Sequence, residues 1–186
     1  MSINAQLHSA FFYLVLVYAL TGSGAGLFIP YFNIYFVQHL RASPALFGLI
    51  DGGANAITAL LTLTAPWFAR RIGKINTITL TRLASIPLLL TIGLTPFLPL
   101  AALLYLFRQG TMDMSAGILQ VFSMEVVSEK HRGLANSSYQ SAFQVPWAIT
   151  APIGGLLIVH FGYPPIFLLG ALFYILTIVT LWAKFR

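Results

Sequence analysis

The sequence predicts an all-α integral membrane protein with six transmembrane helices. Of its 186 residues, 58% are hydrophobic and only 8% are charged, whereas a soluble domain carries about 25% charged residues. So few charges cannot cover the surface of a water-soluble globule of this size. The apolar residues form runs of the length that a helix needs to cross the hydrocarbon core of a bilayer, about 20 residues. We therefore expect a chain solvated by lipid, with residues 1–186 forming a single domain.

Turn residues and charges divide the apolar sequence into six segments. Within hydrocarbon every backbone N–H and C=O group needs a partner inside the structure, and runs this long and uniformly apolar meet that need as helices rather than barrel strands. Prolines and glycines mark the connections around 39–44, 95–99 and 162–165. The predicted spans are 11–38, 44–69, 75–94, 98–124, 135–160 and 165–183.

Basic residues gather at alternate connections. The connections that follow the second, fourth and sixth spans hold Arg70, Arg71, Lys74, Lys130, Arg132, Lys184 and Arg186. The other connections hold Arg41 alone. Since Lys and Arg are enriched on the cytoplasmic side of membrane proteins, this asymmetry predicts that both termini are cytoplasmic. The expected location is a plasma membrane of the bacterial type.

Several classes of function are excluded by the residues present. The chain has no cysteine, so it has neither disulfides nor thiolate metal sites. Its four histidines lack the spacing of metal ligands, and no metal site is expected. The net charge of +6 is spread over membrane edges and forms no continuous patch for nucleic acid. There is no phosphate-binding loop, serine elbow or workable carboxylate pair, so we expect neither an enzyme nor a cofactor.

Four ionisable residues lie inside the predicted spans. They are Asp51, Arg82, Arg108 and Asp113. An intramembrane charge costs at least about 2.5–3.5 kcal/mol, and such groups normally face a partner or a wet cavity. Their depths predict that Asp51 pairs with Arg108 and that Arg82 pairs with Asp113. Two interpretations remain open: ion pairs that lock the bundle, or groups that handle a solute or a proton.

Uncharged amides add a polar stripe. Asn136, Gln140 and Gln144 recur every four residues and therefore share one face of a helix. A polar stripe in lipid should face protein or water, either as interhelical hydrogen bonds or as the wall of a cavity. We expect a substrate cavity lined by Asn33, Asn55, Arg108, Asp113, Gln140 and Gln144.

The connection between the second and third predicted spans carries a family resemblance. Residues 65–74 read Ala-Pro-Trp-Phe-Ala-Arg-Arg-Ile-Gly-Lys. This stretch resembles the signature loop of the major facilitator superfamily, Gly-x-x-x-Asp-Arg-x-Gly-Arg-Arg. Arg71, Gly73 and Lys74 match, whereas Pro66 and Arg70 replace the usual Gly and Asp. A loop that matches the signature only in part is more similar to the loop of the C-terminal repeat of that family than to that of the first repeat.

Two further segments resemble the same family. Residues 124–133, Met-Glu-Val-Val-Ser-Glu-Lys-His-Arg-Gly, are similar to its acidic-then-basic turn after the fourth helix. Residues 152–155, Pro-Ile-Gly-Gly, resemble its fifth-helix glycine motif. The resemblance implies a cytoplasmic gate that includes Arg71, Gly73, Lys74, Glu125 and Arg132. The alternative is a solvated basic loop that only sets topology.

The resemblance also implies a function. Transporters of this family have two six-helix halves around a midplane site, and this chain matches one half. The implied partners are membrane lipid, a small solute, a proton as a candidate coupling ion bound at Asp113, and a second half from a longer chain or a homodimer. Alternating access is the implied mechanism. The alternatives are a non-transporting six-helix partner for assembly or regulation, and a small oligomeric channel.

Overall fold

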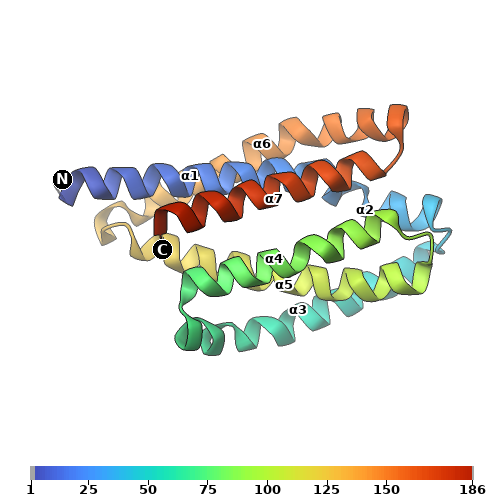
Figure 1. The fold of residues 1–186 in the computed structure, drawn as a ribbon, viewed down its shortest axis with the longest axis horizontal. Helices are drawn as coiled ribbons and strands as arrows, with labels where there is room; N and C mark the ends of the chain where they lie inside the picture. Colours follow the sequence, from blue (N-terminus) through green and yellow to red (C-terminus); the bar gives the residue numbers. More distant parts are fainter. Residues whose placement is uncertain (1–2, 186) are drawn as a thin grey trace.

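The computed structural model describes residues 3–185, with side chains from Ser9 onward, and this part is almost entirely helical. The all-α prediction is confirmed (Figure 1). The elements in chain order are α1 (Ile3–Phe28), the 3₁₀ turn η1 (Ile29–Tyr31), α2 (Phe32–Ile34), the π-helical turn η2 (Tyr35–His39), α3 (Pro44–Ile72), α4 (Lys74–Leu94), α5 (Leu98–Glu125), the 3₁₀ turn η3 (Glu129–His131), α6 (Arg132–Phe161) and α7 (Pro164–Phe185).

Five helical segments are long and apolar enough to cross a membrane. They are Ser9–His39, Pro44–Ile72, Lys74–Leu94, Glu129–Phe161 and Pro164–Phe185, within a few residues of five predicted spans. The remaining predicted span corresponds to α5, which has 28 residues and carries Arg108, Gln109 and Asp113 near its middle. These polar side chains set α5 apart from the others.

The described ends of the chain lie at one end of the bundle, together with the basic connections (Figure 1). Lys184 near the end of α7 donates a hydrogen bond from Nζ to Ser9 Oγ on α1, at 2.7 Å. Lys74 at the start of α4 forms an ion pair with Glu125 at the end of α5. We call this the basic end. The connections 40–43, 95–97 and 162–163 form the opposite end.

The helices form two groups of three. α1 packs on α6 and α7, while α5 packs on α3 and α4, and the contact of α4 with α7 joins the groups (Figure 1). The two outermost helices are the least covered. Only 11% of the most apolar stretch of α3 and 6% of that of α6 are buried within the chain. A face this apolar and this uncovered needs lipid or another polypeptide against it.

The contact of α1 with α6 depends on glycine. A Cβ atom at Gly22 would lie 2.1 Å from the carbonyl oxygen of Phe143, and one at Gly154 would lie 2.3 Å from that of Leu27. Only residues without a side chain permit this backbone approach. By contrast, a Cβ atom at Gly52 on α3 would have no neighbour within 4 Å. Close approach of backbone to backbone at glycine is therefore a property of the α1–α6 contact, whereas Gly93 and Gly170 closely meet aromatic side chains of other helices.

The first span loses its α-helical geometry toward the opposite end. Pro30 lies in η1, where it supplies no backbone N–H. Beyond it, the Tyr31 hydroxyl donates to the Ala151 carbonyl of α6 at 2.6 Å, and the Tyr35 hydroxyl donates to the Ile92 carbonyl of α4 at 2.5 Å. These two tyrosines fasten the irregular segment to its neighbours.

Candidate functional site

Arg82 on α4 lies in the centre of the bundle and is 1% exposed. Its Nε donates to Ser115 Oγ at 2.8 Å, and its Nη1 donates to Thr21 Oγ1 at 3.1 Å. These hydroxyls come from α5 and α1. A buried guanidinium is thus solvated by neutral oxygen atoms, and it links three helices across both groups.

Arg108 on α5 is also 1% exposed, and aromatic rings surround it. Its Cζ lies 5.0 Å from the ring centroid of Phe28 and 5.7 Å from that of Phe32. Its Nη2 donates to the Tyr174 hydroxyl at 3.0 Å, and its Nη1 donates to Gln109 Oε1 at 3.3 Å. The quadrupole of each ring and the tyrosine oxygen stabilise the cation.

The predicted intramembrane ion pairs are wrong. Among the described side chains, only Lys74–Glu125 and Arg132–Glu129 lie within ion-pair distance. Asp51 instead accepts a hydrogen bond from the Tyr105 hydroxyl at 2.7 Å, and Asp113 accepts one from Gln109 Nε2 at 3.0 Å.

The reason lies in helix rotation. Arg108 and Asp113 are five residues apart, which is about 140° around the helix axis. With Arg108 directed into the bundle interior, Asp113 faces elsewhere and lies away from the buried Arg82. Matching depths therefore did not bring the charges together.

One side of α5 carries a row of polar groups, which Ala116 and Gly117 interrupt. Tyr105, Gln109, Asp113 and Gln120 are four, four and seven residues apart, so they follow one helix face. We call these four residues the α5 polar face. Gln109, Asp113 and Gln120 are half-buried, and Tyr105 is buried at the edge next to α3.

Neighbouring helices extend the α5 polar face at both ends. Toward the opposite end, Tyr105 binds Asp51 of α3, and Asn55 Nδ2 donates to the Asp51 backbone carbonyl at 2.9 Å. Toward the basic end, Gln120 Nε2 donates to Asn136 Oδ1 of α6 at 2.9 Å. Polar groups of α3, α5 and α6 thus lie along one surface in three separate hydrogen-bonded sets.

Of the six residues predicted to line a cavity, some lie on this polar surface and others do not. Asn55 and Asp113 belong to this surface, and Gln140 reaches it through a 3.5 Å hydrogen bond to Gln120 Oε1. Arg108 lies behind it and connects through Gln109. The other two, Asn33 on α2 and Gln144 on α6, are exposed, and no contact in the described part of the chain joins them to it.

Sequence reasoning missed two tyrosines. Tyr105 lies four residues before Gln109, so the four-residue spacing used for the α6 amides could have found it on α5. Tyr174 on α7 had no such signal. Its role depends on α7 bringing a hydroxyl to Arg108, which only the packing reveals.

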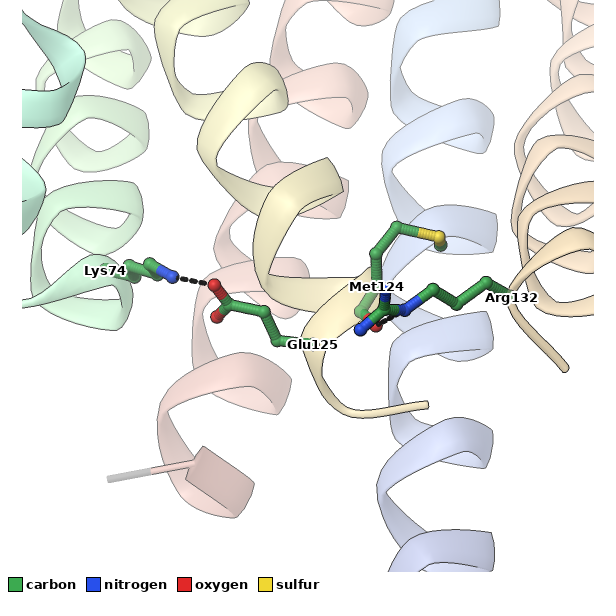
Figure 2. Close-up of polar contacts among 4 residues, drawn as sticks. All are labelled: Lys74, Met124, Glu125 and Arg132. Atoms are coloured by element: carbon green, nitrogen blue, oxygen red, sulfur yellow. Dashed lines mark hydrogen bonds and ion pairs between the residues drawn. The ribbon is translucent and has the colours of Figure 1, made fainter. Parts of the chain in front are cut away.

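At the basic end, two contacts hold the end of α5 from opposite sides (Figure 2). Lys74 of α4 pairs with Glu125, while Arg132 Nε of α6 donates to the Met124 carbonyl at 3.2 Å. Arg132 Nη1 also lies 3.5 Å from Glu129 Oε1. We call Lys74, Met124, Glu125 and Arg132 the α5 end cluster.

The two other residues of the predicted gate shape the turn before α4. Gly73 has a φ of 87° and connects α3 to α4, a conformation that glycine adopts at no steric cost. Arg71 stacks its guanidinium over the Trp67 ring, 5.1 Å from the centroid. Lys74, and not Arg71, is therefore the residue that meets Glu125.

Comparison with known proteins places this architecture in a family. The model of the Major Facilitator Superfamily matches residues 14–186. The chain belongs to the major facilitator superfamily. Among solved structures, it is similar to the crystal structure of a bacterial homologue of the iron transporter ferroportin in an inward-facing state, with a TM-score of 0.78 and 19% sequence identity.

The match to that structure is a match of fold. It covers 94% of this chain and 45% of the other chain, so this superfamily member spans less than half the length of the structure it resembles. Family and fold are those of membrane transporters, and the chain is an integral membrane protein.

Proposed function

We propose that this chain is one six-helix half of a secondary transporter, in which α5 also crosses the membrane as the fourth of six spans, and in which two halves move a small solute by alternating access. The observation that carries the proposal is the α5 polar face, which is joined to α3 and α6. A chain solvated by lipid gains nothing from amides and carboxylates near the middle of its helices unless they face water, solute or another polypeptide.

The uncovered surfaces of α3 and α6 support a second half. These helices border the α5 polar face through Asp51 and Asn136, and they are the least buried of the candidate spans. A second half packed against them would enclose the polar surface between two six-helix units. That half belongs either to a longer chain or to a second copy.

The distribution of charge favours a cation or a proton over an anion as the species bound. Asp51 and Asp113 lie on or beside the polar surface, with neutral Tyr105 and Gln109 as their side-chain partners across it. Both buried arginines lie behind this surface. Asp113 is the carboxylate that we propose for proton coupling, since its hydrogen-bond partner is the neutral Gln109 and no cationic side chain lies within ion-pair distance of it among the described residues, although the charge of Arg108 acts on it from farther away.

The α5 end cluster supports a gate at the basic end. Exposed ion pairs contribute little stability, typically about 0.2–1 kcal/mol, and can therefore break and re-form during a conformational change. Lys74 and Arg132 tie α4 and α6 to the end of α5. We propose that these ties hold one state of the transporter and open in the other, with both termini in the cytoplasm of a bacterial-type cell.

Alternating access can be tested without knowing the solute, because the chain has no cysteine. We would prepare Asn55→Cys and Gln144→Cys, both at exposed positions near the middle of their helices, and Val179→Cys as a control on the outer surface of α7. Each protein, reconstituted in one orientation in liposomes, would receive a membrane-impermeant maleimide either outside or inside.

We expect Asn55→Cys and Gln144→Cys to react from both sides and Val179→Cys from neither, because lipid covers α7. Labelling from one side only would contradict alternating access. No labelling at either cavity position would favour the non-transporting partner. Conductance without saturation in planar bilayers would identify a channel instead.

A further inference from the structure

An apolar groove lies between α3 and α5 near the basic end. It has a volume of about 420 Å³. On α3 it is lined by Thr62, Ala65, Pro66 and Ala69, and on α5 by Met114, Gly117, Ile118 and Val121. These positions recur every three or four residues on each helix, so each helix offers one continuous stripe to the groove.

The groove adjoins the α5 polar face on the side of the basic end. Gly117 lies four residues after Asp113 and three before Gln120, on the side of the α5 polar face, whereas Met114 and Val121 are five and twelve residues after Gln109, about 140° and 120° around the axis. Thr62, Pro66, Gly117 and Val121 are exposed, so the groove is open to the surroundings of the bundle. Its lining has no carboxylate or amide side chain.

Two cations close the groove at the basic end. Arg70 of α3 and Lys74 of α4 complete its lining. Arg70 is exposed, and no hydrogen bond or ion pair involves its side chain in the described part of the structure. Lys74 is half-buried and uses one of its three donors on Glu125. The groove therefore joins an apolar slot within the membrane to a cationic end at its surface.

Space is available in the slot itself. A Cβ atom added at Gly117 would meet nothing within 4 Å, so helix packing does not explain the absence of a side chain there. A long side chain at this position would instead extend into the groove.

We propose that the α3–α5 groove binds an anionic phospholipid, with an acyl chain along the slot and the phosphate between Arg70 and Lys74. Charge complementarity identifies the occupant: a basic pocket between transmembrane helices at a membrane surface matches an anionic headgroup attached to an apolar chain. Lipid binding here requires neither a solute nor a second half, although the site shares Lys74 with the α5 end cluster.

Native mass spectrometry of the full chain in mild detergent tests the site. The probes are dioleoylphosphatidylglycerol and dioleoylphosphatidylcholine, which have the same acyl chains and differ in headgroup charge. The variants are Arg70→Gln and Gly117→Leu. Their matched controls are Lys130→Gln, which removes an exposed charge at the same end, and Gly48→Leu, which adds a side chain to α3 where a Cβ atom also meets nothing within 4 Å.

We expect the wild-type chain to retain phosphatidylglycerol in preference to phosphatidylcholine. Arg70→Gln should weaken retention of the anionic lipid about fivefold, the effect of one basic residue at a membrane surface. Gly117→Leu should weaken retention of phosphatidylglycerol as strongly by filling the slot. Both controls should behave as the wild type.

Three outcomes would overturn the proposal. The first is equal retention of the two lipids. The second is a loss in Lys130→Gln as large as that in Arg70→Gln, which would indicate a diffuse charge effect at the basic end. The third is a dimer in the wild type that Gly117→Leu abolishes, which would assign the groove to a second copy.

Discussion

Lys74, the first residue of α4, forms an ion pair with Glu125, the last residue of α5. The two helices are joined at the opposite end by residues 95–97, so the pair connects the free ends of a helical hairpin. The signature loop of the family usually supplies an aspartate at the position that Arg70 occupies here, so the carboxylate of this ion pair comes from elsewhere. Instead, α5 supplies the anion to the turn between α3 and α4.

Breaking this pair should alter local opening more than global stability. Glu125→Gln is expected to lower the free energy of unfolding by less than about 1 kcal/mol, since both side chains are partly exposed. Amides from Thr77 onward, where the backbone hydrogen bonds of α4 begin, should exchange hydrogen faster, as hydrogen–deuterium exchange mass spectrometry would measure. The charge swap Lys74→Glu with Glu125→Lys should restore slow exchange. Equal acceleration in Glu129→Gln would contradict a specific role for the pair.

The Arg108 site should depend on planar geometry as well as on charge. Arg108→Lys keeps the charge but loses the flat guanidinium that lies over Phe28 and Phe32 and reaches Tyr174. Tyr174→Phe removes one hydrogen bond to a charged group, which is worth about 1.5–3 kcal/mol. Both should lower the midpoint of unfolding by sodium dodecyl sulfate in mixed micelles.

A double-mutant cycle on Arg108 and Tyr174 separates their contact from other effects. The double variant should lose less stability than the two single losses combined. Tyr13→Phe is the control, because Tyr13 is exposed near the basic end. Strict additivity would show that the 3.0 Å contact contributes nothing.

Arg82 should be more sensitive to loss of its partners than to its own removal. Thr21→Val combined with Ser115→Ala leaves a buried cation without its two hydroxyl acceptors, and an unsatisfied buried charge costs several kcal/mol. Adding Arg82→Met to that background should recover part of the lost stability. If the triple variant unfolds earlier than the double variant, the hydroxyls are not what solvates Arg82.

The glycines of α1 should differ from those of α3. Gly22→Ala places a Cβ atom 2.1 Å from a carbonyl oxygen of α6, so the helices must separate, at a cost of about 1–3 kcal/mol. Gly52→Ala meets nothing within 4 Å and should be neutral or slightly stabilising, because alanine favours the helix. Unfolding in mixed micelles measures both. Equal effects would show that the α1–α6 approach is not as close as the structure has it.

Sequence reasoning located the helices well because length and apolar runs report directly on the membrane. Depth along a helix was also accessible: Asp51, Arg108 and Asp113 lie within their spans as expected. The rotation of each helix about its own axis could not be predicted, because helices surrounded by lipid are apolar on most sides and show little periodicity in the sequence. The sequence therefore did not indicate that Arg108 contacts Tyr174 and aromatic rings rather than Asp51.

At the basic end, too, the sequence could not show which of two neighbouring basic residues contacts Glu125. The family pattern singled out both Arg71 and Lys74, but the turn at Gly73 decides between them. Arg71 still belongs to α3 and stacks on Trp67, one helical turn earlier. Lys74 begins α4, which packs on α5, so it is the residue carried to Glu125. The backbone turn, and not residue type, selects the partner.

The break in the first span has a consequence for how the two groups of helices hold together. In a continuous α-helix, residues four apart share a face, and Tyr31 and Tyr35 would reach the same neighbour. With the 3₁₀ and π-helical turns between α1 and α3, they reach different ones, α6 in their own group and α4 in the other. The first span thus contacts both groups, and restoring a regular helix there would remove the Tyr35 hydrogen bond to α4, leaving the α4–α7 contact and Arg82 to join the groups.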